Sequence, residues 1–201
     1  MLKKLTLIAA SSVCAFAMHS AEINVNEKDL ELSAKFDLGQ FNQTVEPDTT
    51  FMGFKYINAS DDYSENEAGD HVNVSGYGEV SFLMKREIRN TGITFGVGVK
   101  ANATKIDDLF VALPLGIEVG YTLPIEIPVS FGASVYYAPE SLSFAKASNY
   151  LEYRTEATVE LIERASVVVG YRYLEMSFDV NGGTTDITYN DAAYFGFRFA
   201  F

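Results

Sequence analysis

Charged residues of both signs recur at every second position along parts of this chain. Glu152, Arg154 and Glu156 have this spacing, and residues two apart on a β-strand point to the same face. Acids and bases on one face can form ion pairs across a confined interior, where an unpaired charge is costly. We predict an interior charge network of Glu118, Glu152, Arg154, Glu156, Glu160, Arg172 and Arg198. The same face is expected to carry Glu31, Lys35, Asp37, Lys55, Glu79, Lys85 and Lys100.

Histidine could supply a general base, because its pKa lies near neutral pH. The chain contains His19 and His71, and His71 lies beside Asp70 and close to Ser75. We interpret His71 as a residue at the junction of a loop and a strand, and the carboxylates above as members of ion pairs. The sequence therefore predicts no catalytic residues and no enzyme activity.

An acidic segment at residues 61–70 could bind a metal. Oxygen ligands at this density could hold Ca²⁺ or bridge it to lipopolysaccharide phosphates. No recognised calcium-loop spacing is present, so a solvated acidic loop is the preferred interpretation. We expect no bound metal and no cofactor. The acids of this segment are Asp61, Asp62, Glu65, Glu67 and Asp70.

The elements that must position these charges are predicted from the alternation of apolar and polar residues. Residues 30–38 and 93–102 alternate clearly, which is typical of a strand with two different environments. With a short strand at 22–26 the total is ten, and bacterial single-chain barrels almost always have an even number of strands. Eight strands are the alternative. The other alternating segments are 51–59, 72–86, 109–123, 129–138, 150–161, 167–178 and 192–201.

Alternation alone does not separate a membrane barrel from a soluble one, because the two differ in the direction of the apolar face. An Arg or Lys that faced lipid at the midplane would cost about 2–4 kcal/mol. Glycines such as Gly96, Gly98 and Gly116 share the charged face, and we interpret them as making room for long Arg and Lys chains. The pattern favours an all-β, transmembrane, antiparallel up-and-down β-barrel with its charges inside.

The connections between the segments predict an orientation. Short connections at 89–92, 123–128 and 163–165 alternate with longer polar ones at 58–70, 139–148 and 179–191. Short periplasmic turns and long extracellular loops are typical of outer-membrane barrels. The connection at 105–108 is a short exception, and 40–49 would be a long turn on the periplasmic side. The register of residues 22–60 is the least defined part of this prediction.

Residues 1–20 are predicted to be a signal peptide, cleaved to leave the barrel domain at 21–201. Lys3 and Lys4 precede an apolar run of about a dozen residues, whereas a helix needs roughly 20 to cross a bilayer. The step Ala15-Phe16-Ala17 suits cleavage, and Ser20 and Ala21 are other possible positions. The chain's single cysteine, Cys14, would be removed with this segment.

The last residues alternate between phenylalanine and other residues. A terminal aromatic residue on such a strand resembles the signal that the outer-membrane assembly machinery reads, here Phe197, Phe199 and Phe201. The expected partners are this machinery, outer-membrane lipids and lipopolysaccharide. The formal net charge of −12 argues against nucleic acid. We expect a monomer in the bacterial outer membrane.

Two motifs resemble those of the YfaZ-type outer-membrane proteins. One is Tyr136-Tyr137-Ala138-Pro139, and the other is Gly170-Tyr171-Arg172-Tyr173. An alternating end at 194–201 follows, so the resemblance covers roughly residues 130–201, and the first half matches in its order of strands and loops. It implies an outer-membrane location and at most a porin-like role, with no catalytic residues. The motif residues are Tyr136, Tyr137, Pro139, Gly170, Tyr171, Arg172 and Tyr173.

Two functions stay open for such a barrel. One is a narrow porin-like conduit with a charge-lined lumen. The other is a non-conducting structural or surface-interaction barrel that acts through its acidic extracellular loops. An eight-stranded barrel is just filled by side chains, and ten strands leave slightly more room. Any conduit is therefore expected to be closed or very narrow, with the charge network at its constriction.

Overall fold

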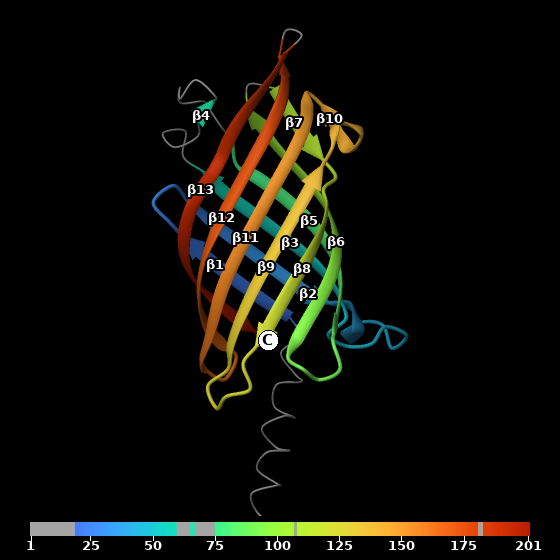
Figure 1. Cartoon of the computed structure of the whole chain (residues 1–201), viewed down its shortest axis with the longest axis vertical. Coiled ribbons are helices and arrows are strands. Elements are labelled where there is room, and N and C mark those ends of the chain that lie inside the picture. Colours follow the sequence, from blue (N-terminus) through green and yellow to red (C-terminus); the bar gives the residue numbers. More distant parts are fainter. Residues whose placement is uncertain (1–18, 60–64, 67–74, 107, 181–182) are drawn as a thin grey trace, which may run out of the picture.

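The chain forms a closed antiparallel barrel of ten strands (Figure 1). The computed structural model describes residues 19–59, 65–66, 75–106, 108–180 and 183–201. The first strand pairs with the last, and the pairing of β6 with β8 closes the ring. The barrel strands are β1 (His19–Val25), β2 (Asp29–Asp37), β3 (Thr50–Ala59), β5 (Tyr77–Glu87), β6 (Ile93–Ile106), β8 (Leu115–Thr122), β9 (Val129–Ala138), β11 (Ala147–Ile162), β12 (Ala165–Val180) and β13 (Gly183–Ala200).

Three short strands lie outside the ring of ten. β7 (Asp108–Ala112) continues β8 along β6 in the same register, and the break falls at Pro114, which has no N–H to donate to the ladder. β10 (Ser143–Ala145) pairs with β7, and β4 (Glu65–Asn66) pairs with β13. Two 3₁₀ turns, Leu38–Gln40 and Glu140–Leu142, follow β2 and β9. Within the described residues, no helix is long and apolar enough to cross a membrane.

The predicted strand number and the uncertain first strand are both confirmed. The strand expected at 22–26 is β1, which begins earlier, at His19. His19 and Ser20, which the predicted boundary gave to the signal peptide, therefore lie in the barrel wall. The 40–49 segment does form a long connection at the end of the barrel that carries Phe201, because the Phe41 ring stacks on that of His19, which is hydrogen-bonded to Phe201.

One predicted loop is wrong. Residues 179–191 are not a long loop, because β12 continues to Val180 and β13 begins at Gly183. Phe178 and Ile187 are buried on the inner face of this hairpin, whereas Asp179 and Thr184 are exposed on its outer face. The polar outer face concealed the strands, since the prediction expected apolar residues there.

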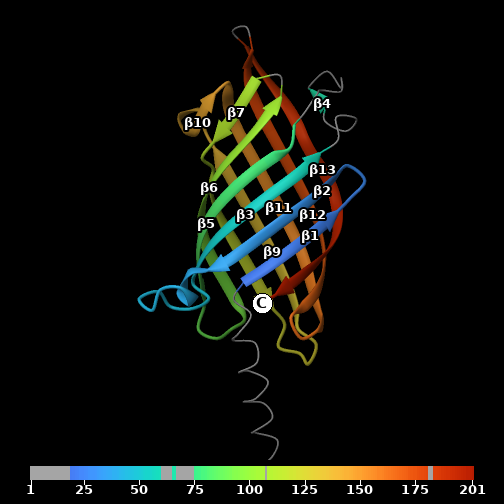
Figure 2. The same ribbon diagram turned by 180° about the vertical axis from the view of Figure 1, so that it is seen from behind.

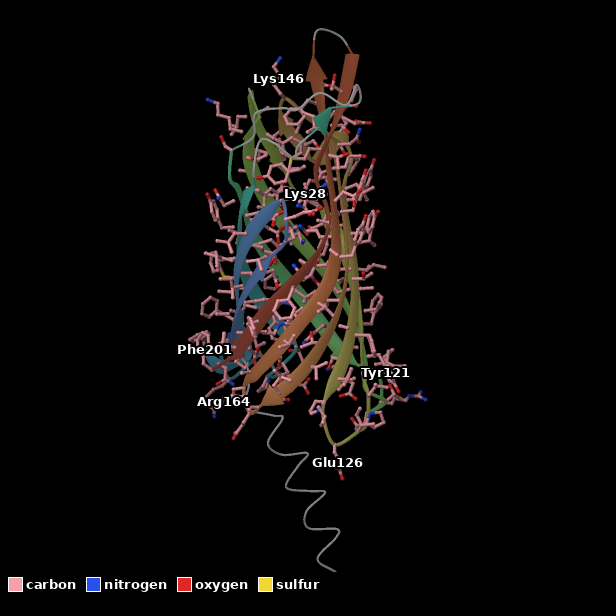
Figure 3. The ribbon with its side chains drawn as sticks, turned by 90° about the vertical axis from the view of Figure 1, so that its left-hand side faces the viewer. Lys28, Tyr121, Glu126, Lys146, Arg164 and Phe201 are labelled. Atoms are coloured by element: carbon pink, nitrogen blue, oxygen red, sulfur yellow. The ribbon has the colours of Figure 1, made fainter. Side chains whose placement is uncertain are left out.

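The wall of the barrel is not equally high on all sides, because its strands differ in length. β1 has 7 residues and β13 has 18, so the wall is low at β1 and β2, on the side seen in Figure 2. In Figure 3, Lys28 in the β1–β2 turn lies well below Lys146, while Glu126, Arg164 and Phe201 mark the opposite end. We call the end with Lys146 the upper end and the end with Phe201 the lower end.

The side chains are arranged inside out relative to a soluble protein, in which charges are seldom fully buried. Glu31 is 0% exposed and Arg172 is 1% exposed, whereas Phe54 is 44% and Phe197 45% exposed. The predicted direction of the two faces is therefore the one observed. The outward apolar residues encircle the barrel, as shown by Ile23, Leu32, Phe54, Phe82, Val97, Ile117, Phe131, Tyr153, Val169 and Phe195.

Candidate functional site

The interior is arranged in layers, which the inward side chains of β11 follow from the upper to the lower end. Tyr150 belongs to an apolar core, Glu152 and Arg154 to two charge clusters, and Glu156 and Thr158 line a cavity below. Successive inward positions lie two residues apart on a strand. The alternation along this one strand therefore places all three layers.

Arg154 and Arg172 are at the centre of the first charge cluster. The two arginines share Glu31: Arg154 Nη1 lies 2.7 Å from Glu31 Oε1, and Arg172 Nη1 binds Glu31 Oε2. Arg172 Nη2 also lies 2.5 Å from Asp29 Oδ2. Glu22 joins the cluster, because its Oε1 lies 2.7 Å from Arg154 Nη2. Buried charges are tolerated when each has hydrogen-bonded partners of the opposite sign, and these do.

Arg198 extends this cluster toward the lower end. Its Nε lies 2.5 Å from Glu22 Oε2 and its Nη2 lies 2.7 Å from Glu156 Oε1. Arg154 also contacts Glu156, at 3.3 Å between Nε and Oε2. Five strands, β1, β2, β11, β12 and β13, are thus joined through their side chains as well as through their backbones.

The second cluster consists of Lys55, Glu79, Lys100 and Glu152, from β3, β5, β6 and β11. Lys55 Nζ lies 2.8 Å from Glu152 Oε1 and 3.2 Å from Glu79 Oε2. Lys100 contacts both carboxylates as well. All four side chains are at most 10% exposed. The cluster is a closed square of ion pairs across the barrel.

Tyrosine hydroxyls cover this second cluster from above. Tyr77 Oη donates to Glu79 Oε2 at 2.7 Å, Tyr150 Oη donates to Glu152 Oε2 at 2.9 Å, and the two hydroxyls lie 2.8 Å apart. Lys100 Nζ lies 4.0 Å from the centre of the Tyr136 ring, a cation–π distance. Tyr136 in turn donates to Glu118 Oε1 at 2.7 Å. These tyrosines connect the charges to the apolar core.

An apolar core fills the upper end of the interior. Many of its side chains are 0% exposed, so solvent does not reach between them. Its residues come from β3, β5, β7, β9, β11, β12 and β13, and none of the described core residues comes from β1 or β2. The core consists of Ile57, Tyr77, Phe110, Ala112, Tyr136, Ala138, Ala147, Tyr150, Leu174, Met176, Phe178, Ile187 and Tyr189, with Leu142 packed against it.

Below the charge clusters lies a cavity of about 480 Å³, which we call the vestibule. It extends to Ser20, Thr122 and Ala200, which lie near the lower ends of their strands. Its walls are charged and hydroxyl-rich, whereas its roof is formed by the charge clusters. Residues that line it include Lys35, Ser81, Lys85, Thr94, Glu118 and Arg198.

The structure brings most of the predicted network together. Glu152, Arg154, Glu156, Arg172 and Arg198 are joined by the ion pairs above, and Glu118 is connected through Tyr136. Glu160 is not part of the ion-pair network: its carboxylate accepts from the backbone N–H of Arg164 in the lower turn, at 3.4 Å.

The sequence prediction of the charge network omitted several residues that form ion pairs in the structure. Glu31, Lys55, Glu79 and Lys100 were expected on the charged face but not in the network, and Glu22 and Asp29 were not singled out. The alternation of Glu22 with Asn24, and of Asp29 with Glu31, was the available signal. Their partners could not be predicted because the pairs join distant residues, such as Asp29 and Arg172, which are 143 positions apart.

Three interior glycines make room for tyrosines, which corrects the sequence interpretation for Gly98 and Gly116, whereas a Cβ at Gly96 would meet Lys85. A Cβ at Gly98 or at Gly116 would collide with Tyr136, and a Cβ at Gly170 would collide with Tyr194. Aromatic rings thus lie flat against stretches of wall that carry no side chain.

The family-motif residues divide between the two faces of the wall. Tyr136, Gly170 and Arg172 face the interior. Outside, the Tyr173 ring stacks on Tyr153 at 4.8 Å. The remaining outer contacts of the motif are Tyr171 Oη with Asp191 and Tyr137 Oη with Asn149, while Pro139 begins the turn after β9.

The chain ends form a seam. Phe197 and Phe199 are exposed on the outer face of β13, opposite Ile23 and Ala21 of β1. Phe201 and His19 exchange both backbone hydrogen bonds, at 2.9 and 3.3 Å. His19 Nδ1 also accepts from the Asp37 N–H at 3.2 Å. The predicted terminal aromatic therefore closes the ring next to the first residue of β1.

The remaining candidates give no chemical site. His71 and almost all of the acidic segment 61–70 lie outside the described residues, apart from the backbone pairing of Glu65 and Asn66. Among the described residues, no group of three His, Cys, Asp or Glu side chains could hold a metal ion.

A comparison with protein-family models identifies the family. The model described as "YfaZ precursor" matches residues 3–201, nearly the whole chain. A search of curated proteins finds no match to this chain.

Proposed function

This chain belongs to the YfaZ family, and on that premise we propose that it is an integral barrel of the bacterial outer membrane that does not conduct solutes in its folded state. Its role would be structural or that of a surface-interaction protein. The buried apolar core at the upper end is the observation that supports the second part of this proposal, the absence of conduction.

The location is supported by the direction of the side chains. A band of exposed aromatic and aliphatic residues surrounds the wall, while charges are buried inside. Such a surface is unfavourable in water, and a closed barrel is the one kind of sheet that can span lipid without leaving backbone groups unpaired. The family's description as a precursor fits an exported protein.

The orientation follows from the two ends. The short turns and Phe201 would face the periplasm, and the taller upper end with β7 and β10 would lie outside the cell. In this orientation the apolar core stands on the extracellular side and the vestibule opens toward the periplasm.

The proposal that the barrel does not conduct is tested by measuring the conductance of the refolded protein in a planar bilayer. We expect no steady conductance, either from the wild type or from the double variant Arg154→Ala, Glu156→Ala. The variant removes part of the charge layer but leaves the apolar core above it intact. Heat-modifiable migration on gels would show that both proteins are folded.

The predicted narrow conduit is the competing function. Steady wild-type conductance that grows in the double variant would contradict the closed barrel and assign the charge layer as a constriction. Steady conductance that is the same in the wild type and in the double variant would also contradict a closed barrel. The ions would then follow a path that avoids Arg154 and Glu156.

A further inference from the structure

The vestibule contains two cations that form no ion pair with any described residue. Lys35, from β2, and Lys85, from β5, line it, and neither forms an ion pair or a hydrogen bond through its ammonium group with any described residue. The bases of the clusters above, such as Arg154 and Lys55, all contact carboxylates. These two lysines therefore differ from the bases of the two charge clusters, each of which contacts a carboxylate.

Lys35 and Lys85 also lie close enough to act on each other. Both side chains line the same cavity, where Asp48, Glu118 and Arg198 are the other charged groups near Lys85. Lys35 pairs across the sheet with Gly53, and Gly53 with Ser81, which lies four residues before Lys85 on β5. Lys85 Nζ rests 4.5 Å from the centre of the Phe51 ring. Two like charges held in one cavity favour an anion between them.

The surroundings provide both space and hydrogen-bond donors. The vestibule measures about 480 Å³, enough for a small organic molecule. Hydroxyl groups of Ser81, Thr94 and Ser134 line it without forming side-chain hydrogen bonds to described residues. Gly96 and Gly120 add no side chains to the opposite wall.

The carboxylates of the vestibule limit the charge of a ligand. Glu118 accepts from Tyr136, and Asp48 lies at the lower rim. Neither forms an ion pair with a lysine, yet both would repel a polyanion. The balance favours one anionic group attached to a polar body.

We propose that the vestibule binds a small polar solute through a single oxyanion group, phosphate or carboxylate, held between Lys35 and Lys85. This inference goes beyond the proposed closed barrel. Because the vestibule opens at the lower end, a ligand can enter it without crossing the apolar core, so binding requires no conduction.

The test is calorimetric titration of the complete mature protein, refolded in an uncharged detergent at low salt, with inorganic phosphate and with acetate in separate experiments. Saturable binding is expected for at least one probe. Lys35→Gln and Lys85→Gln should each weaken it by roughly tenfold or more, because charge-assisted hydrogen bonds are the strong ones. Phosphate alone, acetate alone or both would show which oxyanion is preferred.

The matched control is Lys105→Gln, which removes the same charge from an exposed outward position at the upper end. Its affinity should equal that of the wild type. Absence of saturable binding of either probe would overturn the proposal, as would unchanged affinity in the Lys35→Gln, Lys85→Gln double variant or an equal loss in the control. Heat-modifiable migration of every variant would separate lost binding from lost folding.

Discussion

At the scale of single residues, stability depends on charges that are completely removed from water. Arg172 is the largest fully buried side chain of the barrel, and Asp29, Glu31 and Asn190 surround its guanidinium. Arginine suits this position because its planar fork can bind several oxygens at once. Each partner comes from a different strand than Arg172 itself, so the residue holds β2 and β13 against β12.

Replacing Arg172 with methionine should destabilise the barrel by about 3–5 kcal/mol, the usual cost of leaving one member of a buried pair without its partner. Asp29 would lose its cationic partner, while Glu31 would retain Arg154. The free energy of unfolding in urea, measured on protein refolded in lipid vesicles, checks this.

Arg86→Ala is the matched control. Arg86 also forms an ion pair, with Glu46 at 3.0 Å, but the two side chains are 79% and 67% exposed. Exposed pairs contribute about 0–1 kcal/mol. A loss in Arg172→Met no larger than that in Arg86→Ala would mean that the buried cluster does not stabilise the fold.

At the scale of elements, the first and last strands depend on each other. β1 pairs with β13 from Ser20 to Val25, and His19 continues the contact to Phe201. The His19 ring also lies 5.2 Å from Phe41 and 5.9 Å from Phe201. A mature chain that lacked His19 and Ser20 would lose these contacts at the seam that closes the barrel.

Processing is therefore expected before His19, and the Ala15-Phe16-Ala17 step meets this requirement, with Met18 as the first mature residue. The intact mass of protein purified from the membrane gives the cleavage position. A mature chain that begins at Ala21 would show that the seam forms without the His19 contacts, and would agree with the predicted 1–20 boundary.

At the scale of the whole molecule, the interior differs from one end to the other. The upper end is a packed apolar core like that of a soluble protein, the middle is a charge layer, and the lower end is a vestibule. The height of the wall also varies around the barrel, because β1 and β2 end well below the top of β12 and β13 (Figure 2). β4, which pairs with Ile187 and Thr188, lies at the upper end near this low part of the wall.

The proposed orientation predicts which ends can be labelled from outside intact cells. A cysteine introduced at Lys146 should react with a membrane-impermeant maleimide, whereas one at Glu126 should react only after the outer membrane is opened; the two residues lie at opposite ends in Figure 3. Removal of the signal peptide with Cys14 would leave no native cysteine to interfere. Labelling of the Glu126→Cys variant in intact cells would contradict this orientation.

Much of the fold could be predicted from the sequence because strand alternation is a local property. Residues 30–38, 51–59 and 129–138 are the clearest cases, and they coincide with β2, β3 and β9 to within one residue. The same period of two separated Glu152 and Arg154 from Leu151 and Tyr153 and so assigned the charged face. The upper hairpin of β12 and β13 escaped prediction because its outer face carries polar residues such as Asp179 and Asp186 rather than apolar ones.

The sequence by itself thus indicated the barrel, favoured ten strands over eight, and showed which face carries charge. Tertiary structure alone decided which charges meet, that Tyr136 and Tyr194 occupy the space left by Gly98, Gly116 and Gly170, and that an apolar core fills the upper interior. Closure of the ring and the stagger between strands bring together residues such as Lys55 and Glu152, which are 97 positions apart. A pattern of neighbouring residues contains no information on that stagger, because it arises from pairing around the whole ring.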